Sequence, residues 1–253
     1  MNTTLRNWRL NVAAALLVAT IVGCKRSQPL DSLPGQAELV PSAASAAANR
    51  IRYTARPGGC KVTIAGTSTV HDWTTQGAII GGFFEVEPEF QTDLSLKSVK
   101  SLTTKEVHPK VEVFIPITSL KSTVLAGREK MDEIMREAMR AKDNPRITYL
   151  LTQMVVNGDV PAAGAPVKFD TKGELQVSGV TNLIDMEVTL ERLEGDRLKF
   201  TGAKPLKMTA FKIDPPAPKL ALGMIKCGDD VTIKFEWVVG LVKPAPPAPT
   251  NAP

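Results

Sequence analysis

The sequence predicts an all-β fold, an antiparallel sandwich or barrel, from two observations. In several short segments apolar side chains alternate with polar ones, a period of two that is typical of strands with one buried and one wet face. Turn-forming runs separate these segments, namely Pro57-Gly58-Gly59, Asn157-Gly158-Asp159 and Glu194-Gly195-Asp196. Short strands at this spacing, seven or more in number, predict one antiparallel β domain.

Three strands show the alternation most clearly. Their alternating apolar residues are Val111, Val113, Ile115 and Ile117, then Met186, Val188 and Leu190, then Val231, Ile233, Phe235 and Trp237. Shorter runs predict further strands over residues 61–66, 77–86, 94–102, 146–155, 173–177 and 198–206. We therefore expect one folded body over residues 50–243.

One segment departs from the period of two. Between about residues 124 and 142 the apolar side chains recur at helical spacing, and Pro145 closes the segment. The apolar face of this expected amphipathic helix is formed by Met131, Ile134, Met135, Ala138 and Met139. Such a helix either plugs or covers the β domain, or forms an adaptable methionine wall beside an apolar ligand.

The first 23 residues are expected to be a signal peptide and not part of the fold. Arg6 and Arg9 give a positive start, and residues 10–22 form an apolar stretch that is short for a membrane span. The stretch ends in Gly23-Cys24, which resembles a bacterial lipobox. This resemblance implies cleavage before Cys24 and lipidation of that cysteine, so that a lipid anchors the chain to a membrane.

The segments that flank the body have the composition of tethers. Residues 24–49 are rich in Ser, Pro, Gln and Ala, as in a flexible linker, and residues 244–253 form a Pro/Ala-rich tail expected to be disordered. Lys25 follows the lipobox cysteine, where an aspartate would indicate retention in the inner membrane. We therefore expect a protein that faces the periplasm, with the outer membrane favoured.

Composition excludes several classes of protein. One long apolar run rules out a multi-span membrane protein, and three Cys in 253 residues cannot form a disulfide scaffold. With two His and three Cys, a zinc cluster is hard to assemble, so we expect no metal. The net charge of +5 is a mild excess without a clustered basic stripe, and we expect no nucleic-acid partner.

Five stretches in chain order resemble one family. They are residues 66–73 (GTSTVHDW), 115–122 (IPITSLKS) with 130–132 in the helix, 141–149 (AKDNPRITY), 173–181 (GELQVSGVT), and 208–216 (MTAFKIDPP) with 225–233 (IKCGDDVTI). In this order the set resembles the YceI-like family of bacterial secreted lipid-binding proteins, here in a lipoprotein form.

The resemblance implies an eight-stranded antiparallel lipocalin-like barrel with the helix inserted at about 124–142. It also implies an apolar lumen that holds a long isoprenoid or acyl chain, in accord with the room inside eight strands. We expect an amphipathic lipid, a polyisoprenoid, a quinone or an acyl lipid, and no further cofactor. Hydrophobicity does not distinguish a hollow barrel from a filled one, so a structural or interaction barrel with a packed core is the alternative.

Nine inward residues are the expected ligand contacts. They are Val113, Ile115, Met135, Tyr149, Met186, Val188, Phe211, Phe235 and Trp237. A few polar groups at the mouth are expected to orient the head group.

The stretch His71-Asp72-Trp73 is the one that most resembles a catalytic site. Neither a G-x-S-x-G elbow nor a second suitable histidine accompanies it, so we expect no enzyme activity. The three residues either fix the ends of two strands or line the rim of the pocket.

Cys60 and Cys227 would remain after lipidation of Cys24. An even pair in an oxidising compartment suggests a disulfide. Both cysteines begin a strand, however, and the starts of antiparallel neighbours lie at opposite ends. The sequence leaves both alternatives open.

Overall fold

A computed structural model describes residues 50–124, 126–159, 162, 164–217 and 225–243. All described residues belong to one compact unit within Pro41–Pro253. The predicted signal peptide, Cys24, the linker and the C-terminal tail therefore lie outside the described residues. Within the described part, none of the helices is long and apolar enough to cross a membrane.

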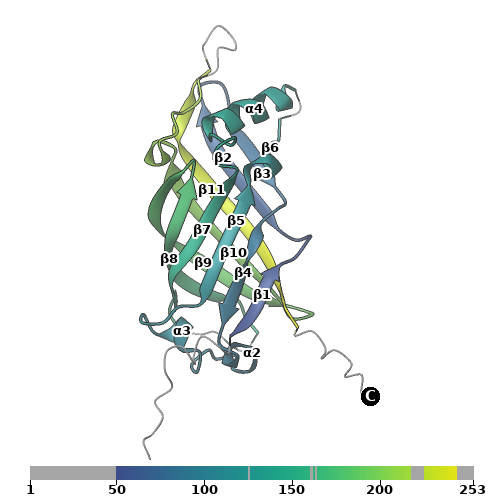
Figure 1. Cartoon of the computed structure of the whole chain (residues 1–253), viewed down its shortest axis with the longest axis vertical. Helices are drawn as coiled ribbons and strands as arrows, with labels where there is room; N and C mark the ends of the chain where they lie inside the picture. The colour runs from purple at the N-terminus through teal and green to yellow at the C-terminus, as the bar shows by residue number, and fades with distance from the viewer. Residues whose placement is uncertain (1–49, 125, 160–161, 163, 218–224, 244–253) are drawn as a thin grey trace, which may run out of the picture. The chain divides into compact units, whose positions relative to one another are not determined.

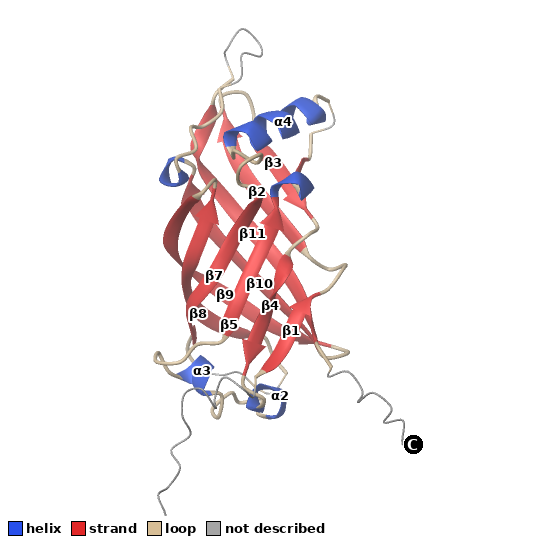
Figure 2. Ribbon diagram, viewed as in Figure 1, coloured by secondary structure: helices blue, strands red, loops and turns tan. Residues whose placement is uncertain are grey.

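Eight strands close into an antiparallel barrel, as the sequence predicted (Figures 1 and 2). The ring consists, in order, of β1 (Ile51–Ala55), β4 (Gly81–Val86), β5 (Lys110–Pro116), β7 (Arg146–Val156), β8 (Val167–Val177), β9 (Val180–Leu193), β10 (Arg197–Lys207) and β11 (Cys227–Leu241). Pairing of β1 with β11, where Tyr53 lies opposite Leu241, closes the ring. Because the ring is closed, each of the eight strands has a neighbour on both sides wherever the strands are paired.

Three short strands extend the barrel beyond this ring. β2 (Lys61–Ser68), β3 (Trp73–Gly77) and β6 (Lys121–Ser122) continue the sheet from β11 in the order β11-β2-β3-β6. β1 and β2 pair with successive stretches of β11, so they form one strand that is interrupted at Pro57-Gly58-Gly59. Gly58 and Gly59 both have φ +79°, a left-handed conformation that glycine adopts without strain.

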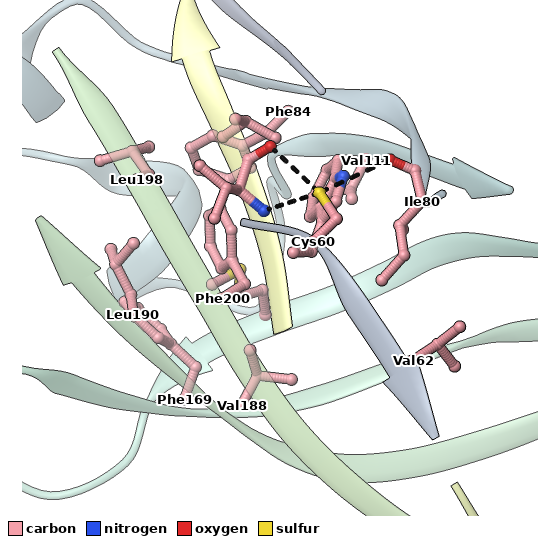
Figure 3. Packing of buried hydrophobic residues seen from close by; sticks show 14 of the residues in the cluster. Cys60, Val62, Ile80, Phe84, Val111, Phe169, Val188, Leu190, Leu198 and Phe200 are labelled. Atoms are coloured by element: carbon pink, nitrogen blue, oxygen red, sulfur yellow. Dashed lines mark hydrogen bonds between the residues drawn. The ribbon is translucent and has the colours of Figure 1, made fainter. Parts of the chain in front are cut away.

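The strand alternation places apolar side chains inside the barrel. Along β8 every second residue is buried, from Val167 to Val177, and the residues between them are exposed. Met186, Val188 and Leu190 of β9 face inward in the same way, as the sequence predicted. Figure 3 shows part of this buried cluster, with side chains of several strands meeting around Phe200 and Val188.

The amphipathic helix is present as α4 (Arg128–Ala138) and lies at one end of the barrel (Figure 1). Asp132 is buried, and its carboxylate accepts a hydrogen bond from Ser122 N of β6 (2.7 Å) and lies 3.4 Å from Lys121 Nζ. After the helix, Arg140 donates to Ser178, and Ser178 Oγ donates to Met139 O (3.0 Å). Polar contacts therefore hold α4 at both of its ends.

The strand predicted over residues 94–102 was wrong. The segment forms turns that lead into the one-turn helix α3 (Lys100–Thr103), and a second one-turn helix, α2 (Glu89–Thr92), precedes it. Both helices lie at the end of the barrel away from α4 (Figure 2). The Asp93 carboxylate accepts hydrogen bonds from the backbone N–H groups of Ser95 (2.9 Å) and Ser98 (2.8 Å), so a local turn replaces a strand ladder.

The apolar residues of this segment are spaced by three and not by two. Leu96, Val99 and Leu102 are all nearly inaccessible to solvent, and together with Phe90 they cover the end of the barrel. Hydrogen bonds to Asp93, first of all from the Ser95 hydroxyl, lower the pKa of the Asp93 carboxyl far below its ordinary value. The Asp93 carboxylate is therefore ionised at neutral pH and keeps its hydrogen bonds to the turn.

Cys60 and Cys227 do not form a disulfide, and both are free thiols. On the paired strands Lys61 lies opposite Glu236, whereas Ser68 lies opposite Cys227. The two cysteines are thus separated by about 25 Å along the strands at ~3.3 Å per residue, far beyond the roughly 7 Å between Cα atoms that a disulfide allows. The buried Cys60 thiol instead accepts a hydrogen bond from Val238 N (3.4 Å), beside the break between β1 and β2 (Figure 3).

Replacing Asp132 by alanine is expected to lower the free energy of unfolding by about 1–3 kcal/mol, because the buried Ser122 N–H loses its acceptor. Lys121→Ala is the control. Lys121 is largely exposed, and its loss should cost less than about 1 kcal/mol. Urea unfolding of both variants measures the difference. Equal losses would show that the ion pair, and not the backbone hydrogen bond, holds the helix.

Candidate functional site

A cavity lies inside the barrel, between the covered end and its middle. Its volume is about 120 Å³, measured over the positions that the centre of a water molecule can occupy. Strands on all sides contribute to its lining, which consists of Val62, Ile64, Ile80, Phe84, Val111, Val113, Ile115, Ile147, Thr148, Tyr149, Leu151, Met154, Thr171, Leu175, Ile184, Met186, Val188, Phe200, Lys204, Leu206, Ile233, Phe235 and Trp237. We call it the lower cavity.

Two glycines keep large side chains of the lower cavity against the wall. A Cβ atom at Gly173 of β8 would lie 2.4–2.6 Å from the Tyr149 ring and hydroxyl, and one at Gly202 of β10 would lie 2.8 Å from the Phe235 ring. Each ring therefore occupies the place where a side chain of the neighbouring strand would stand. This arrangement leaves the centre of the barrel open.

Aromatic rings form the floor of the lower cavity. Phe84 and Phe200 have ring centroids 5.2 Å apart, and Phe200 and Trp237 follow at 5.4 Å. Below them Phe90 packs edge-on against Phe84, and Arg192 lies 4.2 Å from the Phe90 ring centroid and donates to Phe90 O (2.6 Å). The end of the barrel that carries α2 and α3 is therefore filled.

A second cavity, of about 150 Å³ on the same measure, lies under α4. We call it the upper cavity. Met131 and Met135 of α4, and Met139 directly after the helix, line it at intervals of one turn, so this methionine face covers the cavity. The rest of its lining is Ile64, Ser68, His71, Trp73, Thr75, Ser122, Ile134, Ala138, Ile147, Val177, Leu206, Lys207, Met208, Phe211, Ile213, Pro216, Ile225, Cys227, Val231 and Ile233.

The two cavities meet at four shared lining residues, Ile64, Ile147, Leu206 and Ile233. We call this ring the waist. On β11 the lining residues run from Trp237 to Cys227, which is about 30 Å at ~3.3 Å per residue. The interior thus holds two apolar cavities in line with the waist between them, and we call the three together the lumen.

The barrel wall is incomplete beside the waist. β9 and β10 pair only from the Arg197–Leu193 position to the Gly202–Val188 position. Beyond it, residues 180–187 and 203–207 diverge, and the η2 turn (Thr209–Phe211) contacts both strands. Asn182 Nδ2 donates to Ala210 O (2.8 Å) and so holds η2 to β9.

Lys204 contributes a charged side chain to the lower cavity lining. It lies in the diverging part of β10, with its Nζ 3.4 Å from Asp185 Oδ2 of β9. The cation is therefore paired across the gap in the wall.

Two of the residues that line the lower cavity each have a buried polar atom that makes no hydrogen bond of ordinary geometry. These atoms are Tyr149 Oη and Trp237 Nε1. Burial raises the pKa of the Tyr149 hydroxyl, and the neighbouring Thr171 hydroxyl offsets only part of the rise. Tyr149 is therefore a neutral hydrogen-bond donor over the whole physiological pH range.

The nine residues expected to contact a ligand all lie along the lumen. Seven line the lower cavity, and Met135 and Phe211 line the upper one. Their assignment as ligand contacts stays a prediction. The sequence analysis did not single out other lining residues, such as Met154 and Leu175, although both stand at inward positions of alternating strands.

The stretch His71-Asp72-Trp73 forms the turn between β2 and β3. Ser68 Oγ donates to His71 O (2.7 Å), and Trp73 Nε1 donates to Thr67 O (3.0 Å). His71 and Trp73 also line the upper cavity, whereas Asp72 does not. The Ser68 hydroxyl is bonded to the backbone of His71, so these contacts do not form the Ser–His pair that a hydrolase uses.

Within the described ranges, no group of three or more His, Cys, Asp or Glu side chains is arranged to hold a metal ion. Among the described lining residues, the polar side-chain groups are hydroxyl groups, two indoles, one imidazole, one thiol and two lysine ammonium groups. This set can bind and orient an apolar molecule.

Comparison with solved structures gives matches of the same fold. One is BcnA of Burkholderia cenocepacia, at 18% identity and a TM-score of 0.51, with 73% of this chain and 98% of that chain covered. Another is a polyisoprenoid binding domain of Saccharophagus degradans, at 13% identity and a TM-score of 0.53, with 75% and 98% covered. At these identities the likeness shows the fold alone.

No curated protein matches the chain in sequence. The model of the YceI-like domain, in contrast, matches residues 53–239, which include all eight strands of the ring in whole or in part. The chain therefore belongs to the YceI-like domain family.

Proposed function

We propose that the protein binds one amphipathic lipid and buries its long apolar chain in the lumen. The observation that carries this proposal is the pair of neighbouring apolar cavities, which share the waist residues and are closed at the floor by aromatic rings. The description of the Saccharophagus degradans domain as polyisoprenoid-binding supports a polyisoprenoid or a quinone with such a tail, and an acyl lipid fits the same lumen.

The physical driving force is removal of the lipid chain from water. Each buried CH₂ group contributes about 0.8 kcal/mol, so a chain that fills both cavities supplies the affinity of a carrier. An empty apolar lumen, in contrast, forfeits dispersion contacts along its lining. The alternative is a packed barrel that acts only through its outer face. The two cavities would have no function in such a protein.

The helix face supports this reading of the upper cavity. Met131, Met135 and Met139 are unbranched and polarisable, and such side chains adapt to ligands of irregular shape. Because the sheet is not paired between β6 and β7, α4 and its connections bridge the barrel wall there. Movement of α4 would open the lumen without breaking a strand ladder.

The chain is further proposed to be a lipoprotein that faces the periplasm, with the outer membrane favoured. The lipobox-like stretch that ends in Cys24, and Lys25 after it, support this location. The tether of residues 24–49 would let the barrel reach lipids at a distance from its anchor. The protein would then be a lipid carrier, store or sensor rather than an enzyme.

Native mass spectrometry of the protein from a bacterial periplasm tests the binding function. We expect a discrete added mass that extracts into organic solvent as an isoprenoid or acyl lipid. Met186→Trp places a large ring in the lower cavity and should reduce the bound lipid about tenfold, since overpacking costs 1–3 kcal/mol. Glu187→Trp, on the outer face next to it, is the matched control and should retain the lipid.

An apo mass for the unaltered protein, with no shift on addition of prenyl quinones or fatty acyl lipids, would contradict the proposed binding. Equal loss of lipid from both tryptophan variants would point to a damaged fold and not to an occupied lumen.

The proposed anchor is tested by Cys24→Ala in the full chain. Without the thiol that carries the lipid, we expect the variant to take up no fatty-acid label. The unaltered protein should take up the label and be found in the membrane fraction. A label retained by Cys24→Ala, or an unlabelled unaltered protein, would contradict the anchor.

A further inference from the structure

The gap between β9 and β10 leaves inward-facing side chains partly accessible to solvent. Ile184 and Met186 of β9 and Leu206 of β10 line the lower cavity beside this gap, and all three are half-buried. Where the same two strands are paired, the inward residues Val188 and Phe200 are buried. The end of the ladder therefore coincides with access to the cavity lining.

Contact with the cavity alone does not explain this exposure. Thr171 and Leu175 of β8 line the same lower cavity, yet they are only 3% and 6% exposed. Thr171 lies directly opposite Met186 in the β8–β9 ladder, so the two residues stand at the same depth in the barrel. The half-buried state of Met186 therefore reflects an opening on its β10 side. We call this opening, between residues 184–187 and 203–206, the side window.

The side chain of Lys204 passes through the side window. Lys204 alternates along β10 with Leu206 and Phe200, which face the lumen, so its Cβ points inward as well. Its Nζ nevertheless lies 3.4 Å from Oδ2 of Asp185, a residue on the outer face of β9 that is 80% exposed. The aliphatic part of Lys204 therefore runs from the lumen through the window and holds the ammonium group in water, as lysines beside apolar surfaces do.

The side window is fastened more weakly than the helix end of the barrel. The exposed Lys204–Asp185 ion pair contributes little to stability, because water competes for both charges. α4 is held by the buried Asp132 carboxylate, which accepts a hydrogen bond from Ser122 N. Loss of a buried hydrogen bond costs more than loss of an exposed ion pair. The window is therefore the part of the wall that opens more easily.

We propose that the apolar chain of the ligand enters and leaves the lumen sideways through the side window, and that Lys204 is the latch that closes it. Rotation of the lysine side chain away from Asp185 clears the window. No hydrogen bond between β9 and β10 has to break, because their ladder ends below the window. This inference rests on the proposed function and adds the route of exchange and the residue that controls it.

A cross-link across the side window tests the route. In the full-length double variant Asp185→Cys/Lys204→Cys, a short bis-maleimide joins the two new thiols. The matched control is Glu191→Cys/Lys199→Cys with the same reagent. Lys199 and Glu191 also form an ion pair between β9 and β10, but they lie opposite each other in the paired part of the ladder. Mass spectrometry of peptides confirms each cross-link.

The cysteines already present affect both cross-linked proteins alike. Cys60 is buried, and burial raises the pKa of the Cys227 thiol, which slows its reaction with a maleimide.

Retinol, a fluorescent isoprenoid alcohol, serves as the probe, because it quenches the emission of the lumen residues Trp73 and Trp237. Retinol-loaded protein is mixed with an excess of phosphatidylcholine vesicles, and the recovery of tryptophan emission gives the release rate. The cross-link across the window, introduced after loading, is expected to slow release about tenfold or more. The control cross-link should change the rate by less than about twofold.

The latch is tested by Asp185→Asn, which removes the charge that holds the ammonium group of Lys204 and leaves the lysine in place. We expect retinol release and uptake to become about twofold to fivefold faster, in line with the small contribution of an exposed ion pair. Asp132→Ala, which loosens α4 instead, should leave the release rate unchanged.

An unchanged release rate with the window cross-linked, or equal slowing by both cross-links, would overturn the proposed route. Faster release from Asp132→Ala together with an unaltered rate for Asp185→Asn would assign exchange to α4 and overturn it as well. Failure of the unaltered protein to bind retinol would instead contradict the proposed function itself, so the two failures are distinguishable.

Discussion

The structure depends on how the barrel closes without filling its interior. Pairing of β1 with β11 joins the ends of the sheet, and strict alternation then directs every second side chain inward. A filled core would need large side chains across the middle. Instead, the rings of Tyr149 and Phe235 lie against the barrel wall, in the spaces that Gly173 and Gly202 leave free. The resulting lumen is apolar and can be stabilised by a ligand.

The two ends of the barrel have different roles. The α2–α3 end is closed by the packed rings of Phe84, Phe90 and Phe200, which move little in a dense aromatic core. Toward the α4 end, the ladder is missing between β6 and β7 and between the diverging parts of β9 and β10. Ligand exchange there breaks the fewest backbone hydrogen bonds.

The alternation of β9 and β11 predicted an antiparallel sandwich or barrel, and the helical spacing of three methionines predicted the helix. The resemblance to the YceI-like family then implied the eight-stranded barrel and its lumen. Such patterns show which side chains are buried. They do not show whether those side chains line an open lumen or fill a packed core. The turn around Asp93 was missed because its hydrogen bonds compete with a strand that the composition also allows. Pro205 is the residue that could have indicated the gap between β9 and β10. Proline has no backbone N–H to donate, so it suits a strand edge that is not paired with a neighbour. The glycine–ring pairs join residues of neighbouring strands, so only the register reveals them.

The most direct test of the account is a crystal structure of the protein as purified from its producing cells, without added lipid. The account predicts continuous, elongated electron density that begins above the rings of Phe200 and Trp237, passes the waist at Ile147 and ends beneath Met135 of α4. A lumen closed by inward-turned side chains, or one that holds only water molecules, would contradict it.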